Sequence, residues 1–543
     1  MMKYKIKCIF LITIIASLVL TNCTNHTQLT KKIFRYNETA GIQSLDPAFA
    51  KNQSNMWAIH QLYNTLVQVN DSLHIVPSLA KRWQYSADKR VITFTLHTHI
   101  QFHPSQAFVP NTQRLLTAHD VVYSYSRLLS PQVASPGAWL FNGKVDTVAP
   151  FTAINDSVFQ LKLLQPFQPI LGILSTQYCS IVPHEVVEFY GTDFRSHPCG
   201  TGPFMLEQWQ EGQGLTMIRN PTYYEHDSAG IPLPYLDGIK VSFYDSKAAE
   251  FLLFRKNKID FINDIDASFK DEILTKKGTL KPNWQGTIKV NKHAYLNVEY
   301  LGILVDAANP LVKLSPLNIT KVRQAISCGF NKEKLMLYLR NSIGTAATSG
   351  MVPMGLPSFN ASMVPGYSYN PTKALQLLTQ AGYPNGKGLP SIALSTIPAY
   401  ADLATYIAKE LELIGIKVVV DVMQKSLLLE KTSKSQATFF RGSWIADYPD
   451  AENYLALCYS KNPAPPNYTR YNNKAYDLLY EQAISETNEQ AKYKLYQQMD
   501  KIIVQDAPLI PLWYDEAIHL VQPSITGFAP NALNMLELRK CIK

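Results

Sequence analysis

The sequence predicts an α/β fold, and two observations support that prediction. Strand-like and helix-like stretches alternate along the whole chain, which has no internal repeat and no long low-complexity linker. The clearest case is residues 402–422, where an apolar helical stripe from Leu403 to Ile414 is ended by Gly415 and followed by an apolar run at 416–422. A helix, a glycine stop and a buried strand in succession are typical of open α/β sheets.

The remaining elements follow from local signals in chain order. Alternation at period two predicts a strand, a threonine or asparagine cap opens a helix, and glycine or proline ends it. These signals predict a strand at 91–96, a helix at 117–129 capped by Thr117, a helix capped by Asn318, a helix from Asn370 and Pro371 to Gly382, an irregular surface loop at 462–467, and a helix at 487–504 that ends before Pro508.

The N-terminus predicts export. Three lysines precede an apolar run from Ile9 to Leu20, after which the sequence turns polar. A basic start followed by an apolar core that is short for a membrane span is typical of a signal peptide, which we place at residues 1–22. The ending Leu-Thr-Asn-Cys23 resembles the lipobox of bacterial lipoproteins, so Cys23 is expected to be acylated. Asn22 departs from the usual small residue there, and the alternative is an ordinary signal peptide with an incidental cysteine.

The composition is that of a large globular protein. Hydrophobic residues make up 46% of the 543 residues and charged residues 17%, which suits a folded chain of two or three domains. No segment after the leader approaches about 18 apolar residues in a row, so a lipid would be the sole membrane attachment. The net charge of +9 includes the leader lysines and is otherwise scattered, which gives no support for a nucleic-acid partner.

Cysteine usage leaves two interpretations open. Five cysteines remain after Cys8 in the leader and Cys23, so at least one must be unpaired. Cys179 and Cys199 are the best candidates for a disulfide in an exported protein. The alternative is that all five are small buried hydrophobic residues.

Familiar catalytic signatures are missing from the chain. There is no G-x-S-x-G motif of a hydrolase nucleophile, and Glu188 stands where the second histidine of a zinc helix beginning His184-Glu185 would be. Residues 382–387 are one residue short of a phosphate-binding loop, and we interpret them as a helix stop and turn. The sequence therefore argues neither for an enzyme nor for a cofactor.

Two groups of residues resemble metal sites only in part. His97, His99 and His103 lie close in sequence, and the first two share one face of a strand; the alternative, which we favour, is surface-strand histidines. The acidic residues between 447 and 452 lack the spacing and the glycine of an EF-hand calcium loop. We therefore predict no metal.

Ten short motifs occur in order along the mature chain. They are SLDP at 44–47, LYNTL at 62–66, PSLAKRW at 77–83, TAHDVVYS at 117–124, GTGPF at 200–204, RNPTY at 219–223, VRQA at 322–325, KALQLL at 373–378, GSWIADYPD at 442–450 and PLIPL at 508–512. Together they resemble the solute-binding proteins of peptide importers, the dipeptide/oligopeptide-binding family (extracellular solute-binding proteins, family 5). The departures are local: residues 104–116 are longer than the family's turn, and Ile445 replaces a cysteine seen in some members.

The resemblance implies a two-lobed, periplasmic-binding-protein-like fold with an additional inserted subdomain. Residues 31–62, 190–293 and 515–543 would form lobe one, 63–189 the inserted subdomain, and 294–514 lobe two, which carries the ligand. Because the chain crosses twice between lobes, a hinge would let them close over a solute for delivery to ABC importer permease subunits. We expect a monomer at the periplasmic face of the membrane, held there by the lipid on Cys23.

The resemblance also implies a peptide site in lobe two. Asp447 matches the aspartate that receives the peptide amino group in this family; the alternative is that it caps the turn before Pro449. The extended residues Ser443 to Ile445 would offer backbone groups to the peptide, as an added strand does. Trp444 would lie along the ligand or fill core.

Other site residues are expected on several elements. Arg441 is the best candidate for the peptide carboxylate, because guanidinium binds carboxylate through two parallel hydrogen bonds; the alternative is a surface or interlobe salt bridge. The family's backbone ledge in lobe one corresponds to Lys51, Asn52 and Gln53. Trp139 stands where the inserted subdomain can reach the ligand.

Two alternatives to a peptide carrier stay open. Other members of the family bind nickel complexes, haem or oligosaccharides, although Asp447 favours an amine-bearing ligand over a sugar. From another class, the chain could be a secreted hydrolase lipoprotein, which turnover of added substrate would reveal.

Overall fold

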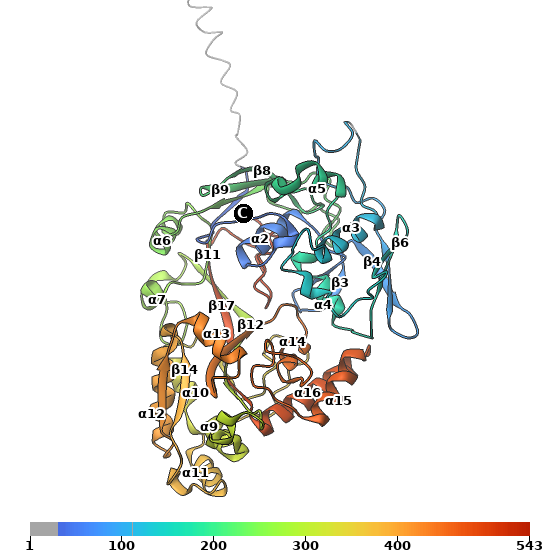
Figure 1. The fold of residues 1–543 in the computed structure, drawn as a ribbon. Coiled ribbons are helices and arrows are strands. Elements are labelled where there is room, and N and C mark those ends of the chain that lie inside the picture. The colour runs from blue at the N-terminus through green and yellow to red at the C-terminus, as the bar shows by residue number, and fades with distance from the viewer. Residues whose placement is uncertain (1–30, 111) are drawn as a thin grey trace, which may run out of the picture.

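The computed structural model describes residues 31–110 and 112–543, so the leader and Cys23 lie outside the described residues. Figure 1 shows two lobes, one above the other, with a third body beside the upper lobe. This is the predicted two-lobed α/β architecture with an inserted subdomain. We keep the names lobe one, inserted subdomain and lobe two for the ranges given above, whose boundaries stay a prediction.

One 11-stranded sheet runs through both lobes. Each strand is hydrogen-bonded to the next in the order β8 (Phe204–Gln210), β9 (Gly214–Arg219), β10 (Gly238–Ser242), β1 (Ile33–Asn37), β11 (Phe261–Asn263), β17 (Leu509–Val521), β12 (Lys289–Ile303), β16 (Phe439–Ile445), β14 (Ile392–Thr396) and β15 (Val418–Val422), and β13 (Thr345–Ala346) pairs with β17.

The inserted subdomain has sheets of its own. A four-stranded sheet has the order β4 (Ala80–Tyr85), β5 (Val91–Leu96), β7 (Val158–Lys162) and β6 (Phe151–Asn155), and a two-stranded one joins β2 (Val67–Val69) to β3 (Ile75–Pro77). Its helices are α3 (Ala118–Leu129), α4 (Ile170–Leu174) and α5 (His184–Tyr190).

Helices cover the large sheet in both lobes (Figure 1). Lobe one carries α2 (Gln53–Leu62), α6 (Lys247–Arg255) and α7 (Ala267–Ile273). Lobe two carries α8 (Pro310–Lys313), α9 (Thr320–Gly329), α10 (Lys332–Leu339), α11 (Pro371–Gln380), α12 (Ala401–Glu412), α13 (Lys425–Ser433), α14 (Glu452–Leu455), α15 (Lys474–Ser485) and α16 (Glu489–Asp506).

Local capping explains the elements that the sequence predicts well. The strand at 91–96 is β5, and α3 starts after Thr117, whose backbone N–H donates to Asp120 Oδ2 over 2.8 Å. The Asn370 side chain accepts the N–H of Lys373 at 2.8 Å and so opens α11. After α12 the chain turns at Gly415, whose φ of +85° favours glycine. The late helix α16 begins two residues after the predicted start.

Two predicted elements differ from the structure. Asn318 does not cap α9, because residues Pro316–Asn318 form a separate short turn and the helix begins at Thr320. The strand at 416–422 is not buried: β15 starts at Val418 and lies at the edge of the sheet, where Val419 and Val422 are half exposed. Strand order, which depends on distant segments, decides whether an apolar run is central or at an edge.

The predicted disulfide is wrong. Cys179 and Cys199 are free, as are the other three cysteines that the structure describes, and all five are buried. Cys199 Sγ donates to the carbonyl oxygen of His103 at 3.2 Å. Burial raises the pKa of the Cys179 thiol to about 12, so it stays protonated. The cysteines therefore act as small hydrophobic residues, which is the alternative that the sequence left open.

Two strands, β12 and β17, carry the chain between the lobes (Figure 1). They pair antiparallel from Lys289 opposite Val521 to Gly302 opposite Leu509. The Val521 end of β17 pairs with β11 of lobe one, whereas the other end of β12 pairs with β16 of lobe two. The ladder is interrupted by a register shift between Ala294 and Val298. A second register shift follows between Glu299 and Tyr300, so the two crossings form a paired ribbon with two irregular levels.

The inserted subdomain also touches lobe two. The backbone N–H of Gln168 donates to the carbonyl oxygen of Ile484 at 2.7 Å. Lys492 Nζ donates to Gln168 Oε1 at 2.9 Å and pairs with Asp450 at 3.0 Å. This subdomain therefore bridges the two lobes on one side of the molecule. Within the described ranges, no helix combines the length and the apolar character that crossing a membrane requires.

Candidate functional site

Strand β16 presents an open backbone edge in lobe two. On one side, Phe439–Ile445 pairs with β12 along its whole length. On the other side, β14 meets it only at Phe440, opposite Ser395. Among the described residues, no strand pairs with the outer edge from Arg441 onward. These backbone groups are available to an added strand, as the sequence predicts for Ser443 to Ile445.

Asp447 lies just beyond this edge in an unusual environment. Solvent reaches its side chain, yet protein surrounds it closely enough that burial raises the pKa of its carboxyl. A hydrogen bond from Asn453 Nδ2 at 3.3 Å and the charge of Lys144 act in the opposite direction. An opposite charge placed beside this carboxyl would favour its ionised form.

Asn453 holds the two predicted site residues Trp444 and Asp447 together. Its Oδ1 accepts the indole N–H of Trp444 at 2.8 Å and the backbone N–H of Asp447 at 3.3 Å. Trp444 is half buried and packs against the main hydrophobic core with one side. The indole N–H of Trp444 therefore has a hydrogen-bond acceptor, and this bond fixes the ring beside Asp447.

The turn that follows is capped by another aspartate. Asp450 Oδ1 accepts the backbone N–H of Glu452 at 2.9 Å, and its other oxygen pairs with Lys492. Within the described part of the chain, the Asp447 carboxylate accepts no backbone N–H. The geometry therefore does not support the turn-cap alternative for Asp447.

Two side chains of the inserted subdomain, Lys144 and Tyr178, interact electrostatically with Asp447, and Trp139 lies beside Lys144. The Trp139 side chain is 41% exposed, so its ring is free to meet a ligand. Lys144, five residues on in the same loop, is one of the charges that act on Asp447. Burial, with the nearby Asp447 charge, raises the pKa of the Tyr178 hydroxyl to about 12. The Tyr178 ring packs on Gly137, where an added Cβ would lie 2.5 Å from it.

Arg441 is committed to a partner within lobe two. Its guanidinium pairs with Glu299 of β12, and both side chains are buried. The ring of Tyr400 covers it, with the ring centroid 3.4 Å from Cζ. Because side chains alternate along a strand, Arg441 and Trp444 lie on opposite faces of β16. The structure thus shows a salt bridge for Arg441, inside one lobe rather than at the surface or between lobes.

The predicted ledge in lobe one serves mostly to start a helix. Asn52 caps α2 by accepting the N–H of Asn55 at 2.9 Å, and Gln53 Oε1 accepts from Asn263 of β11 at 3.1 Å. Lys51 is exposed and lines a cavity. Among the described residues its side chain has no hydrogen-bond or ion-pair partner, unlike those of its two neighbours.

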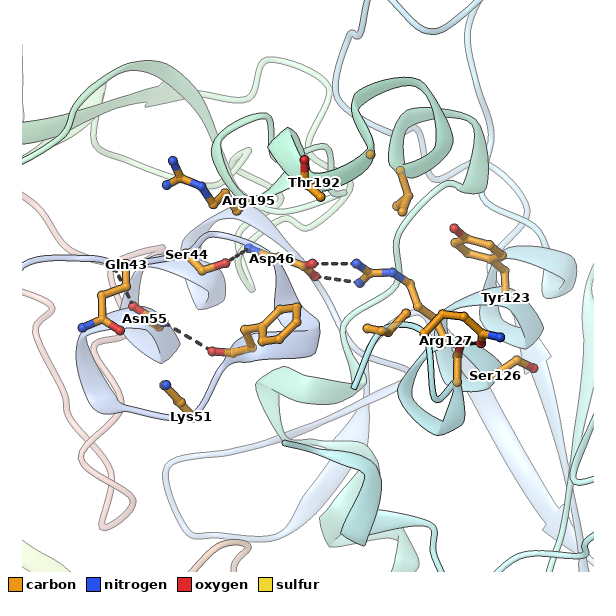
Figure 2. A pocket seen from close by; sticks show the side chains of 16 residues that line it. Gln43, Ser44, Asp46, Lys51, Asn55, Tyr123, Ser126, Arg127, Thr192 and Arg195 are labelled. Carbon is orange, nitrogen blue, oxygen red and sulfur yellow. Dashed lines mark hydrogen bonds and ion pairs between the residues drawn. The ribbon is translucent and has the colours of Figure 1, made fainter. Parts of the chain in front are cut away.

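That cavity lies between lobe one and the inserted subdomain (Figure 2). Its volume is about 890 Å³, and no residue of lobe two lines it. Asp46 and Arg127 form a two-fold hydrogen-bonded ion pair across it, with distances of 2.7 and 2.6 Å. Since the pair neutralises itself, the cavity offers little fixed charge apart from Lys51 and Arg195, whose guanidinium pairs with Glu211. Asp447 and this cavity are separate in the structure.

Among the described residues, His97, His99 and His103, which were considered for a metal, do not form a cluster of ligands. His103 is buried, bonds the carbonyl oxygen of Gly202 at 3.0 Å, and has its pKa lowered to about 4 by burial. A different trio, Asp120, His184 and Glu185, does bring three possible metal ligands together. Arg114, however, already pairs with both of its carboxylates. A bound cation would have to displace that guanidinium.

The site also contains residues that the sequence did not single out. Asn453 and Lys144 both lower the pKa of Asp447, and the Asp447 charge in turn raises the pKa of Tyr178. Lys144 and Tyr178 come from segments far from Asp447 in the chain. Of these residues, only Lys144 could have been predicted from the sequence, because it lies in the same short loop as Trp139.

Comparison with known proteins identifies the family. Residues 74–466 match the model of the bacterial extracellular solute-binding proteins, family 5. The chain belongs to this family. Its members are substrate-binding proteins of transporters, not enzymes.

Individual relatives are distant but cover most of the chain. Haem-binding protein A of Haemophilus influenzae is 25% identical over 86% of this chain and 84% of its own length. Dipeptide-binding protein DppE of Bacillus subtilis is 23% identical over 96% of both. Among solved structures, HbpA2 from Haemophilus parasuis has a TM-score of 0.82 at 23% identity, covering 94% of this chain and 99% of that one. The murein tripeptide-binding protein MppA in its unliganded open form has a TM-score of 0.80 at 22% identity, with 94% and 97% coverage.

Proposed function

We propose that this protein is a lipid-anchored solute-binding protein that captures peptides and delivers them to the permease of an ATP-driven importer. The observation that carries the proposal is Asp447, a carboxylate open to solvent yet closely surrounded by protein, beside an unpaired strand edge. A peptide with a free amino terminus has an ammonium group that can pair with the Asp447 carboxylate. It also has a backbone that can pair with the strand edge.

The peptide's amino terminus would bind Asp447. Once the lobes close over it, a carboxylate in a low-dielectric cleft is costly unless it is paired, and an ammonium supplies both charge and hydrogen bonds. The backbone of Ser443 to Ile445 would pair with the first peptide residues. Since neither interaction involves a peptide side chain, the site would accept many sequences.

The aromatic residues would form the walls of the site. Trp444 and Trp139 stand on lobe two and the inserted subdomain, so closure would bring them to the same ligand. Lys51, Asn52 and Gln53 would supply the opposite ledge through their backbone, because two of their side chains are already engaged. Arg441 could bind a peptide carboxylate only while its guanidinium also stays paired with Glu299.

Similarity supports a peptide more than any other solute. The relatives include dipeptide-binding proteins of Bacillus subtilis and Escherichia coli and a di/tripeptide-binding protein of Pseudomonas aeruginosa. They also include a haem-binding and a probable deoxycholate-binding protein, so similarity alone does not identify the solute. Asp447 favours a ligand with an amine, which neither haem nor a bile acid carries.

The decisive experiment replaces Asp447 by asparagine. Loss of a hydrogen bond between charged groups costs about 1.5–3 kcal/mol, so Asp447→Asn should weaken a free-amine peptide by roughly ten- to a hundredfold. The N-acetylated form of the same peptide should bind wild type poorly and respond little to the substitution. Calorimetry on both proteins with both peptides measures the four affinities. Equal losses for both peptides would make Asp447 structural, and cleaved peptide that increases with protein concentration would favour a hydrolase.

A further inference from the structure

Asn453, on α14, has a buried side chain whose amide can point in only one direction. Its Oδ1 accepts two N–H groups, that of the Trp444 indole at 2.8 Å and that of the Asp447 backbone at 3.3 Å. The oxygen of an amide can accept such bonds, whereas its nitrogen can only donate. The Nδ2 group is therefore the end that faces the Asp447 carboxylate.

The two oxygens of that carboxylate differ as a result. Oδ2 of Asp447 accepts a hydrogen bond from Nδ2 of Asn453 at 3.3 Å. Among the residues that the structure describes, no group donates to Oδ1. Because the side chain of Asp447 is open to solvent, Oδ1 is the oxygen that has its full capacity left for a ligand.

The loop that carries these groups is held in place by strand β12. The carbonyl oxygen of Leu296 accepts the backbone N–H of Ala446 at 2.8 Å and the hydroxyl of Tyr454 at 2.6 Å. Within the loop, the N–H of Asn453 donates to the carbonyl oxygen of Asp450 at 3.1 Å. Both ends of the loop between β16 and α14 are thus tied to one residue of a neighbouring strand, so the position of Asn453 does not depend on a ligand.

We propose that Asn453 is a positioning residue of the candidate site, which holds Oδ2 of Asp447 so that Oδ1 is presented to the ammonium of the ligand. The same amide sets the ring of Trp444 beside that oxygen. This role rests on the peptide-binding function proposed above, and Asn453 acts through Asp447 rather than by touching the ligand.

The hydrogen bond from Asn453 also affects the charge of Asp447. Burial raises the pKa of this carboxyl, and the Asn453 donor opposes that rise because it favours the ionised form. The other titratable groups that interact electrostatically with Asp447 are Lys144, Tyr178 and Tyr454. Only the ionised carboxylate attracts an ammonium as a counter-charge. Without Asn453, binding should therefore be lost at a higher pH on acidification than in the wild type.

The test follows affinity against pH for one peptide in two forms. The probe is the tightest binder from a panel of dipeptides and tripeptides, used with a free amino terminus and as its N-acetylated form. Asn453→Leu keeps the approximate shape of the side chain but has neither donor nor acceptor. It should weaken the free-amine peptide by roughly three- to tenfold at neutral pH, and its affinity should begin to fall at a higher pH. The acetylated peptide should show neither change.

A matched control removes a different bond of the same amide. Trp444→Phe keeps an aromatic ring but deletes one of the two N–H groups on Oδ1 of Asn453, and it leaves the bond to the Asp447 carboxylate intact. It should keep the pH profile of the wild type. Unfolding temperatures without ligand show whether each variant is folded, and Asn453→Ala, for which the same shift is expected, replaces a leucine variant that is not.

A measurement on the wild type needs no variant of Asn453. In protein with isotope-labelled asparagine, the side-chain amide signal of Asn453 should titrate with the same midpoint as the pH profile of peptide binding, since its Nδ2 donates to the titrating group. A signal that does not titrate would refute the role of Asn453.

The outcomes separate this role from the proposed function. If Asp447→Asn weakens the free-amine peptide but Asn453→Leu keeps the wild-type profile, or weakens both peptide forms equally, the role of Asn453 is refuted and the peptide function stands. A shift of the profile in Trp444→Phe as large as in Asn453→Leu would also refute it, because packing would then account for both. If Asp447→Asn leaves binding of the free-amine peptide unchanged, both proposals are refuted.

Discussion

Arg441 and Glu299 form a buried salt bridge diagonally across the neighbouring strands β16 and β12. The residues are 142 positions apart in the chain, and the ring of Tyr400 covers the guanidinium. The Nε atom of Arg441 has no hydrogen-bond partner among the described residues. The pair therefore has a structural role that is independent of any ligand, and its strength can be measured.

Glu299→Gln should destabilise the protein by about 3–5 kcal/mol, because it leaves Arg441 buried without its counter-charge. The double variant Glu299→Gln with Arg441→Met should be destabilised by less than the sum of the two single ones. Urea unfolding of the four proteins gives the coupling energy. Single-variant losses below about 1 kcal/mol would show that the pair is loose enough for Arg441 to serve a ligand.

Asp500 should make stability depend on pH in a defined direction. Burial raises the pKa of its carboxyl to about 7, although it accepts the backbone N–H groups of Met351 at 2.7 Å and Val352 at 3.2 Å. Since the folded pKa lies above the unfolded value, the native state binds the proton more tightly. This contribution to stability is full below about pH 4 and is lost as pH rises through 7.

Asp500→Asn removes that dependence. Relative to wild type, the variant should gain roughly 4 kcal/mol at most in the free energy of unfolding between pH 4 and pH 8, on top of a constant offset. Denaturant unfolding at several pH values measures the difference. The exposed Asp421→Asn is the matched control and should show a flat difference. A flat difference for Asp500→Asn as well would mean that Asp500 is charged in the native state.

The five described cysteines should behave as free thiols. In protein unfolded without reductant, peptides containing Cys179 and Cys199 should be fully alkylated, because no disulfide protects them. The same peptides from native protein should be almost unlabelled, since both thiols are buried. Mass spectrometry after digestion reads both states. Labelling that requires a reductant would restore the disulfide interpretation.

The proposed lipid anchor depends on Cys23. Cys23→Ser should abolish incorporation of a labelled fatty acid and release the protein from the membrane fraction, because no second attachment is predicted. Wild type and variant are compared after metabolic labelling and fractionation. Equal incorporation in both would contradict the lipobox interpretation.

The sequence predicts those features that depend on neighbours in the chain. Thr117 and Asn370 open helices, and Gly415 ends one, because capping involves groups only a few residues apart. Asp447 is proposed as a ligand residue because it lies in a family motif of nine residues, and in the structure it follows the open edge of β16.

What the sequence missed depends on distant segments. The run at 416–422 resembles a buried strand, but its place at the edge is decided by the order of all strands in the sheet. Lys144 and Tyr178, which interact electrostatically with Asp447, belong to a subdomain about 300 residues away in the chain. Local sequence patterns cannot predict such a long-range interaction. Arg441 looked available for the same reason, since Glu299 is remote from it.

The ribbon of β12 and β17 sets the kind of motion that the lobes can make. Its hydrogen-bonded ladder resists sliding and splaying, so that bending is easiest at the two register shifts, between Ala294 and Val298 and between Glu299 and Tyr300. We expect the lobes to follow nearly one trajectory between open and shut, whatever the cargo's side chains. The closed protein would then present the same outer contour each time. A transporter could bind that one outer surface in a single docking geometry and still accept many different ligands.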